Sequence, residues 1–588
     1  MKKVDVPVLI VGGGGAGLTA SMLLSQLGVE TLLVSSLPTT SVLPKAHVLN
    51  QRAMEILTDV GVANEIYARG TPPENMRYSG WYAGLAGPHP DYGREIARIE
   101  SWGAGGLDLD WASASPCLQT NLPQIRLEPI LKARAEELRP GAIRFNHELT
   151  ALEQDEDGAT STVLDKDIGE EYQVRSQYVL ACDGGRTVGK LLGVEMEGPR
   201  GLMSVVSIHM TADLSRWARD PEVLIRWLWL PRNGTQAVLV PMGPDSWGHD
   251  SEEWVFHLNY QSQDTRALDD ARVEEDMRQA LGIGDHPVII HKISRWALEG
   301  VLASNFQVGR TFFAGDAGHR HPPTGGLGLT SAVHDAHNIC WKLAAVLAGY
   351  ASPRLLETYE PERRPADARN VQRSLENSFN HMRIRDALGL REDAGEDANW
   401  RQLERLWSCE PADAEHKRNV LRVVASQSME FREHNVEYGY TYTSAAIVSD
   451  GSPARVCLDD VHVYEPSTRP GHPLPHAWLD NAQGKRLPIV NLVKPGRFLL
   501  IAADKGQAWC RAANKVGQAL RVPVDAICIG HTEGDFVDPR CDWLRRREFS
   551  SDGAILVRPD RFVAWRSMSS SEDPEAALTT ALSRILGR

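Results

Sequence analysis

The sequence predicts an α/β protein of several domains, in which an antiparallel sheet interrupts the first domain. Three observations lead to this prediction. A strand, a glycine-rich turn, a helix and a second strand follow one another in residues 4–34. Apolar and polar residues alternate within 203–260, which is the pattern of half-buried strands. A further strand–helix–strand series occupies 498–558, and the chain of 588 residues has room for about three or four domains.

The opening segment carries a glycine-rich turn between an apolar strand at 4–11 and a helix at 18–27. Gly12, Gly14 and Gly17 fill the spacing G-x-G-x-x-G. In that motif the first glycine makes the tight turn, the second lets the backbone approach a pyrophosphate, and the third allows close helix packing. Because the motif lies between a strand and a helix, we predict a Rossmann-like domain that binds a dinucleotide.

The second strand of this unit, at 31–34, lacks the acidic residue that usually follows it and binds the ribose hydroxyls. Ser35 and Ser36 stand at that place. A serine hydroxyl can still accept a hydrogen bond from the ribose. The departure therefore concerns the adenosine contact, and the predicted pyrophosphate site is unchanged.

After the opening unit, further helices and strands are predicted up to residue 282. Met54, Leu57 and Val60 share one face of a predicted helix. Residues 75–115 are rich in Gly, Trp and Tyr without a clear period, so we predict a loop there. The turn at 231–234 has the composition of a hairpin, which predicts antiparallel pairing of its flanking strands. Further predicted elements are helices at 122–138 and 266–282 and strands at 143–145, 159–163, 178–181, 223–230 and 235–240.

A second glycine-rich helix start follows a short apolar strand at 311–314. Asp316 comes directly after this strand, and Gly325, Gly326 and Gly328 precede a helix with apolar residues at helical spacing. A carboxylate at a strand end and a helix N-terminus together favour a polar, partly anionic ligand. A tight strand-to-helix turn without a ligand is the alternative.

The last third of the chain is predicted to be separate from this unit. Residues 370–440 are charged and helical, and proline-rich sequence at 464–475 marks a linker. A small α/β domain follows, with strands at 498–502, 527–529 and 554–558 and a helix at 508–520. The eight cysteines contain no C-x-x-C pair, so we interpret them as reduced thiols packed in cores and predict no metal site.

Composition excludes several classes of partner. The 63 basic and 77 acidic residues give a net charge of −14, which argues against nucleic acid or an anionic membrane as the main partner. No apolar run approaches the roughly 20 residues of a transmembrane helix. The start of the chain is interrupted by Asp5 and lacks a signal cleavage site, so we expect a cytoplasmic protein.

The order of the motifs resembles that of the single-component FAD-dependent aromatic hydroxylases. The three motifs are residues 12–17, Asp183 with Gly184 after a strand, and Gly315 with Asp316 before the second glycine-rich helix start. Within this family the chain resembles the branch of phenol hydroxylase and 2,4-dichlorophenol monooxygenase. The stretches that carry the closest likeness are 45–55, 315–324, 359–363 and, in the thioredoxin-like C-terminal domain of that branch, 556–565.

The resemblance implies a division into domains. It implies an FAD-binding domain (1–75, 112–190 and 300–370), a substrate-binding sheet domain (76–111 and 191–299), a helical segment (371–445) and a thioredoxin-like domain (446–588). Because the last domain lacks a C-x-x-C pair, we expect it to be structural or oligomeric and not redox-active. A homo-oligomer, dimer or tetramer, is the expected assembly.

The resemblance also implies roles for individual residues. Gly12, Gly14 and Gly17 would hold the FAD pyrophosphate, and Asp316 would bond the ribityl or ribose region. The remaining positions that the family implies for cofactor binding are Gly328 facing the flavin pyrimidine, Gly326 at the same helix entry, Lys45 near a phosphate, Gln124 on FAD, and Asp183 and Gly184 toward FAD and the nicotinamide donor. The alternatives are an ordinary surface residue for Lys45 and Gln124, and a turn aspartate for Asp183.

The family chemistry implies hydroxylation of a phenol, ortho to its hydroxyl group. NADPH or NADH would visit to reduce one bound FAD, O₂ would give a C4a-hydroperoxide, and this species would attack the ring. A single G-x-G-x-x-G fits one bound FAD and a transient donor better than it fits a reductase with two such sites. The small aromatic substrate, O₂ and the donor are therefore the expected partners.

His47 is the first candidate for the base that takes the phenol proton, since imidazole titrates near neutral pH. It occupies the position at which a related phenol hydroxylase carries a catalytic aspartate. The alternative is a hydrogen-bonded structural histidine. His319 and His321, which flank the flavin loop, are weaker candidates.

Two other functions stay open at this point. One is a polyketide-type aromatic hydroxylase with the same fold and a larger ring system as substrate. The other is a flavoprotein that does not turn over oxygen. The stretch 227–231 is one residue short of the tryptophan motif of flavin-dependent halogenases, so we interpret Trp227 and Trp229 as core or pocket-lining residues.

Overall fold

The computed structural model describes residues 2–260, 269–453 and 456–588. Its first sheet has eight strands, of which six run in the order β18-β19-β10-β1-β2-β7, and β9 and β8 extend it beyond β10. β1, β2, β7, β10 and β19 are parallel neighbours, as a Rossmann-like sheet requires. The strands are β1 (Lys2–Val11), β2 (Thr31–Ser35), β7 (Ile143–Phe145), β8 (His147–Gln154), β9 (Ala159–Asp165), β10 (Glu170–Ala181), β18 (Gln307–Val308) and β19 (Thr311–Phe313).

Two helices with glycine-rich starts cover this sheet. α1 (Gly15–Gln26) follows β1, and α8 (Leu327–Leu347) packs against α1. The predicted parallel sheet and both helix starts are therefore confirmed. β8 lies at an edge of the sheet, beside β9, and was not predicted from the sequence pattern.

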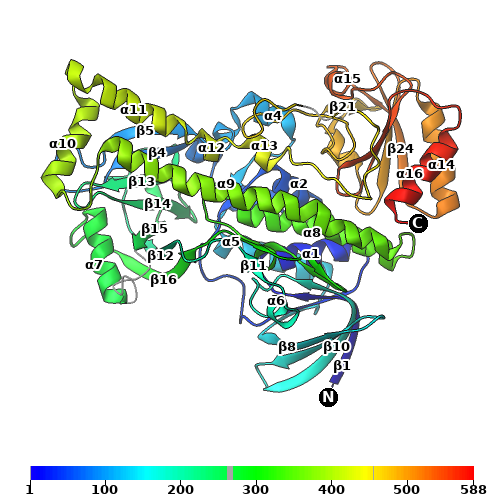
Figure 1. Cartoon of the computed structure of the whole chain (residues 1–588), viewed down its shortest axis with the longest axis horizontal. Helices are drawn as coiled ribbons and strands as arrows, with labels where there is room; N and C mark the ends of the chain where they lie inside the picture. Colours follow the sequence, from blue (N-terminus) through cyan, green and yellow to red (C-terminus); the bar gives the residue numbers. More distant parts are fainter. Residues whose placement is uncertain (1, 261–268, 454–455) are drawn as a thin grey trace.

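The second sheet has seven strands in the order β16-β12-β15-β14-β13-β4-β5 and forms a separate layer (Figure 1). The predicted hairpin is confirmed, because Leu230 of β13 pairs with Thr235 of β14 in an antiparallel register. The strands are β4 (Tyr78–Ala83), β5 (Glu95–Glu100), β12 (Met203–Thr211), β13 (Val223–Leu230), β14 (Thr235–Gly243), β15 (Glu253–Tyr260) and β16 (Ile289–Leu298). α7 (Asp270–Leu281) follows β15, and residues 266–268 of the predicted helix lie outside the described residues.

The prediction of a loop over 75–115 is wrong. β4 pairs in parallel with β13, and β5 pairs with β4. Trp81, Tyr82 and Ala83 are all buried, because both faces of β4 are covered. A strand that is buried on both faces has no alternation of polar and apolar residues, so the pattern that reveals strands was missing.

Long helices connect the layers. α9 (Tyr359–Leu388) runs beside α8 and reaches the second sheet, where α10 (Glu396–Trp407) and α11 (Ala414–Ala425) complete the helical cover (Figure 1). Ile384, Leu388 and Val420 lie in the same apolar cluster as the tryptophans of β13 and β4. None of the described helices combines the length and the hydropathy that crossing a bilayer requires.

The C-terminal domain lies at the end of α8, next to the chain's C-terminus (Figure 1). Its sheet contains the order β24-β23-β26-β27, in which β23 and β24 are parallel and β26 is antiparallel to β23. This is the strand order of a thioredoxin-like fold. Its elements include β23 (Phe498–Ala503), α14 (Gln507–Leu520), β24 (Val524–Gly530), β26 (Ala554–Val557), β27 (Val563–Ser567) and α16 (Pro574–Ile585).

Candidate active site

The three sequence motifs meet at one junction of the first domain. A Cβ added to Gly12 would lie 2.0 Å from the carbonyl oxygen of Cys182, so the first motif touches the residue before Asp183. A Cβ on Gly17 would lie 1.9 Å from the carbonyl oxygen of Gly12. A Cβ on Gly315 would lie 3.1 Å from Cβ of Ala16 and of Ala332. Glycine is required at these close approaches, and they bring the starts of α1 and α8 together.

Open space remains above both helix starts. The N-caps are glycines, and neither makes a side-chain hydrogen bond to its helix. A Cβ on Gly328 would meet no atom within 4 Å, and a Cβ on Gly14 would meet only Glu128 Oε1, at 3.5 Å. Asp316 is exposed at the same junction. Two helix N-termini with free amide donors and a free carboxylate fit a ligand that has a pyrophosphate and several hydroxyl groups.

The loop that contains Lys45 is fastened to the start of α5 (Gln124–Leu138). The backbone amide of Gln124 donates to the carbonyl oxygens of Pro44 at 2.8 Å and Ala46 at 2.9 Å. Lys45 is exposed and has a φ of 46°, so its side chain projects from a left-handed turn. The structure therefore brings together Lys45 and Gln124, the two residues predicted to contact the cofactor. We call this edge of the site, formed by residues 44–46 and the start of α5, the rim.

Glu128 is a member of this rim that the sequence did not single out. It accepts hydrogen bonds from the Ser41 amide at 2.6 Å and from the side chain of Gln124. Burial raises its pKa, and Lys45 opposes that effect. Burial thus weakens the negative charge that Glu128 would place beside a phosphate at Gly14. Its position one helical turn after Gln124 is the only signal in the sequence.

The side chain of Asp183 stabilises the turn in which this residue lies. Its carboxylate accepts hydrogen bonds from the amides of Gly185 at 3.1 Å, Thr187 at 2.7 Å and Val188 at 2.9 Å. Gly184 between them has a φ of +73°, which glycine adopts without strain. The contacts are those of a turn aspartate, which was the alternative for this residue.

His47 is held in a defined tautomer. Its Nδ1 lies 2.5 Å from Oδ1 of Asn121, and Nδ2 of Asn121 donates to Oγ1 of Thr71 at 2.7 Å. Because the amide group of Asn121 is thereby oriented, Nδ1 of His47 is the donor and Nε2 keeps its lone pair. Burial lowers the pKa of His47, and the bond to Asn121 only partly opposes this. The imidazole is therefore neutral at pH 7 and able to accept a proton.

An aromatic cluster with Trp81, Trp102, Trp227 and Trp229, which we call the aromatic wall, lies next to the loop of His47. Val48 contacts the position of a Cβ on Gly326 at 3.1 Å and belongs to the apolar cluster of Trp81 and Trp227. The ring of His381, from α9, stacks on Trp227 with centroids 3.9 Å apart. Among the described residues, four buried indole N–H groups of this cluster have no hydrogen-bond partner: those of Trp81, Trp102, Trp227 and Trp229. Trp227 and Trp229 are buried, which agrees with their interpretation as core or pocket-lining residues.

Two buried carboxyl groups, those of Glu430 and Glu433, pack against the start of α8, and Glu437 lies near Glu433; the sequence did not predict these groups. Glu430 accepts a hydrogen bond from the Gly325 amide at 3.2 Å and bonds to His381. Oε1 of Glu433 lies 2.5 Å from the position of a Cβ on Gly325, and neither of its oxygens has a partner among the described residues. Burial, then Glu437 and Glu430, raise the pKa of Glu433, and burial raises the pKa of Glu437 to about 8. Glu437 is therefore mostly protonated near neutral pH, and burial disfavours the charged form of Glu433 as well.

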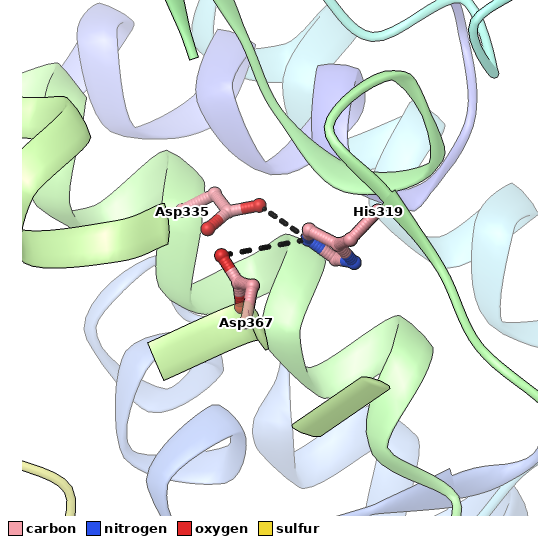
Figure 2. Close-up of side chains that lie close together, drawn as sticks. All are labelled: His319, Asp335 and Asp367. Carbon is pink, nitrogen blue, oxygen red and sulfur yellow. Dashed lines mark hydrogen bonds and ion pairs between the residues drawn. The ribbon is translucent and has the colours of Figure 1, made fainter. Parts of the chain in front are cut away.

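His319 belongs to a buried ion network and not to an open site (Figure 2). Figure 2 shows its imidazole directed at Asp335 on α8 and Asp367 on α9. Asp335 also accepts from the Gly315 amide at 2.9 Å and from Arg363 at 2.7 Å. Burial alone would lower the pKa of His319, but Asp367 and Asp335 raise it to about 9. A charged imidazole cannot act as a base, so the network fixes the loop around Gly315.

This cluster also has the residue types of a metal site. Arg363 already bonds to both carboxylates, with Nε 2.7 Å from Asp335 and Nη2 2.7 Å from Asp367. The guanidinium and imidazolium groups thus occupy the place that a cation would take between the two acidic side chains. His321 lies nearby, with its ring centroid 4.9 Å from that of His319. Burial holds the pKa of His321 well below its usual value, and its role as a weaker candidate base stays a prediction.

The two aspartates of this network are expected to respond differently to neutralisation. Asp335→Asn removes the charge that holds Arg363 and His319, so we expect a loss of about 3–5 kcal/mol in the free energy of unfolding. Burial raises the pKa of Asp367, so Asp367→Asn should cost less than about 1 kcal/mol. Urea denaturation of both variants measures the difference. Equal losses would contradict this description of the network.

Comparison with known proteins identifies the family. Residues 5–374 match the family described as FAD binding domain, and residues 467–588 match the aromatic-ring hydroxylase C-terminal family. The chain belongs to the FAD-dependent aromatic hydroxylases. The hydroxylase fold predicted from the sequence, with its FAD-binding domain and C-terminal domain, is thereby confirmed.

Relatives of this hydroxylase span its whole length. The 2,4-dichlorophenol 6-monooxygenase of Delftia acidovorans is 34% identical, with 99% of this chain and 98% of the relative covered. The phenol 2-monooxygenase of Pseudomonas sp. (strain EST1001) is 35% identical, covering 99% and 93%. The tetracenomycin A2 monooxygenase-dioxygenase of Streptomyces glaucescens is 34% identical, covering 100% and 98%. A crystal structure of the flavin-dependent monooxygenase PieE with FAD and substrate has a TM-score of 0.92 and 36% identity, with both chains fully covered.

Proposed function

We propose that this hydroxylase is a monooxygenase that adds one hydroxyl group to a phenolic compound, ortho to the existing hydroxyl, with NADPH or NADH as electron donor. The observation that carries the proposal is the state of His47. The imidazole of His47 is neutral, with Nδ1 bonded to Asn121, and it precedes Val48, which borders both the glycine-rich start of α8 and the aromatic wall. A phenol must lose its proton as the ring is attacked, and this group can accept it.

The space over the two helix starts supports a binding place for FAD. In the proposed arrangement Gly12, Gly14 and Gly17 receive the pyrophosphate at the start of α1, and Asp316 bonds a sugar hydroxyl. Gly326 and Gly328 leave room for the flavin ring at the start of α8. Lys45 and Gln124 close the rim. The chemistry that FAD supplies when bound is electron transfer from the donor to O₂ and delivery of one oxygen atom to the ring.

The surrounding residues are proposed to prepare the substrate and to exclude water. The aromatic wall around Trp227 offers flat surfaces for a ring and unpaired N–H donors for an oxygen. Burial raises the pKa of Glu433 well above its usual value, which disfavours a negative charge beside a phenolate. His47 accepts the phenol proton, and Asn121 holds its ring in the required orientation.

A polyketide-type hydroxylation is the second candidate. The relative named for tetracenomycin A2 is as similar in identity and coverage as the relative named for 2,4-dichlorophenol. Both are 34% identical, so overall similarity does not separate a single ring from a fused ring system. Substrate size is set by individual side chains on the wall formed by β4, β13 and α9.

A substrate panel tests the proposal. The purified flavoprotein is given NADPH or NADH with phenol, 2,4-dichlorophenol, naphthols and hydroxyanthraquinones, and donor use, O₂ uptake, peroxide and product are measured. We expect at least one single-ring phenol to raise donor oxidation roughly tenfold or more and to yield a catechol. Product only from the fused rings would support the second candidate. Stimulation by none of these compounds would refute both.

A further inference from the structure

Two thiols are in contact within the C-terminal domain. Cys510 lies on α14 and Cys528 on β24, and their sulfur atoms are 3.5 Å apart. Among the described residues, no other pair of cysteine sulfurs makes such a contact. Cys528 is 6% exposed, whereas Cys510 is partly open to solvent. Because the chain has no C-x-x-C motif, a domain that is not redox-active was expected, and this thiol pair was not predicted.

The geometry is close to that of a bond. A disulfide has an S–S distance of about 2.05 Å, so the two sulfurs must approach by roughly 1.5 Å. Side-chain rotation in the first turn of α14 can supply such a movement without unfolding the sheet. The hydrogen bond between the thiols lowers the pKa of Cys528, which favours the thiolate needed for reaction.

We propose that Cys510 and Cys528 form a redox-active dithiol that hydrogen peroxide closes to a disulfide. One thiolate sulfur attacks a peroxide oxygen, the O–O bond breaks, and a sulfenic acid and hydroxide form. The second sulfur then attacks the first, the S–O bond breaks, and water leaves. In total two thiols are oxidised, one peroxide is reduced, and two water molecules are released.

The source of the oxidant rests on the proposed function. A flavin monooxygenase that reduces O₂ without transferring oxygen to a ring releases hydrogen peroxide, so the oxidant arises on the same molecule. The thiol pair lies in the apolar cluster that joins the C-terminal domain to α8, through Trp341 and Phe498, whose ring centroids are 5.8 Å apart. Closure would join α14 to β24 within this cluster.

The test begins with added peroxide, which needs no flavin turnover. The full reduced chain is treated with a few equivalents of hydrogen peroxide, alkylated, digested and analysed by mass spectrometry. We expect a disulfide-linked pair of peptides and a mass of the oxidised chain that is 2 Da lower than that of the reduced chain. The number of titratable thiols after denaturation should fall from eight to six, and dithiothreitol should reverse both changes. Cys510→Ser should abolish the link. Cys409→Ser, which removes an exposed cysteine, should keep it.

Particular outcomes would overturn the inference. One is oxidation of Cys510 to sulfinic acid without a disulfide to Cys528. The other is a disulfide between other cysteines. Thermal unfolding of Cys510→Ser checks that the variant is folded, and wild-type protein should gain a few degrees in Tm on oxidation whereas the variant should not. A second arm uses NADPH turnover with and without catalase. A link that added peroxide forms but turnover does not would refute the source of oxidant and leave the dithiol standing.

Discussion

Gly328→Leu is expected to abolish FAD binding while the folded apoprotein is kept. The side chain would enter the space at the start of α8 where no protein atom lies within 4 Å of the added Cβ. The position has helical backbone, so replacing glycine should stabilise the helix by about 0.5–1 kcal/mol. Loss of flavin binding with unchanged or raised stability would show that the space is kept for a ligand and not for packing.

The measurement is a titration of apoprotein with FAD, followed by flavin fluorescence, together with thermal unfolding. We expect the Kd to rise at least 100-fold for Gly328→Leu and by a smaller factor for Gly328→Ala. Gly349→Asn is the matched control, because this glycine lies just beyond the other end of α8, also has no neighbour within 4 Å, and has a φ of +75° that asparagine tolerates. Binding of FAD to Gly328→Leu with wild-type affinity would contradict the proposed flavin site.

His47→Gln should remove hydroxylation and leave the flavoprotein otherwise intact. Glutamine can still donate to Oδ1 of Asn121, but it offers no group that accepts a proton near neutral pH. A general base contributes about 10²–10⁴-fold, so the rate of product formation should fall by that factor. Donor oxidation should continue and its oxygen should appear as peroxide.

The pH profile of the wild-type enzyme gives a second readout. Only the neutral imidazole can accept a proton, and burial lowers the pKa of His47 below its usual 6.5. Product formation should therefore be constant around pH 7 and fall on the acid side, below pH 6.5, with this limb absent in His47→Gln. Asn121→Leu should weaken coupling less than His47→Gln does, because it frees the ring but keeps the base. Coupled hydroxylation by His47→Gln at the wild-type rate would assign the base elsewhere.

The parts of the site that the sequence predicted are those fixed by local geometry. Gly12, Gly14 and Gly17 lie within one β-α turn, and Asp316 precedes the start of α8 by a short loop. Such motifs need particular residues at fixed spacings, because the backbone passes within van der Waals contact of its neighbours. The residues of the proposed cofactor site could therefore be predicted from the sequence with little further information.

The substrate end depends on contacts between distant residues. Glu430 reaches Gly325 across 105 positions, and Asn121 reaches His47 across 74. Glu433 lies in a charged helical stretch that reads as solvated surface, yet it is fully buried. No periodicity marks a polar residue whose partners come from another domain. For the same reason the contact of Cys510 with Cys528 follows from the packing of α14 on β24 and from no motif.

We propose that this chain transfers one atom of molecular oxygen to a phenol. The most direct test is turnover of the best phenol from the substrate panel under ¹⁸O₂ in ordinary water, with mass spectrometry of the product. The product is expected to be 2 Da heavier than the product formed under ordinary O₂, with one labelled oxygen on the ring carbon next to the original hydroxyl. A product without label, or donor oxidation that gives only peroxide, would contradict it.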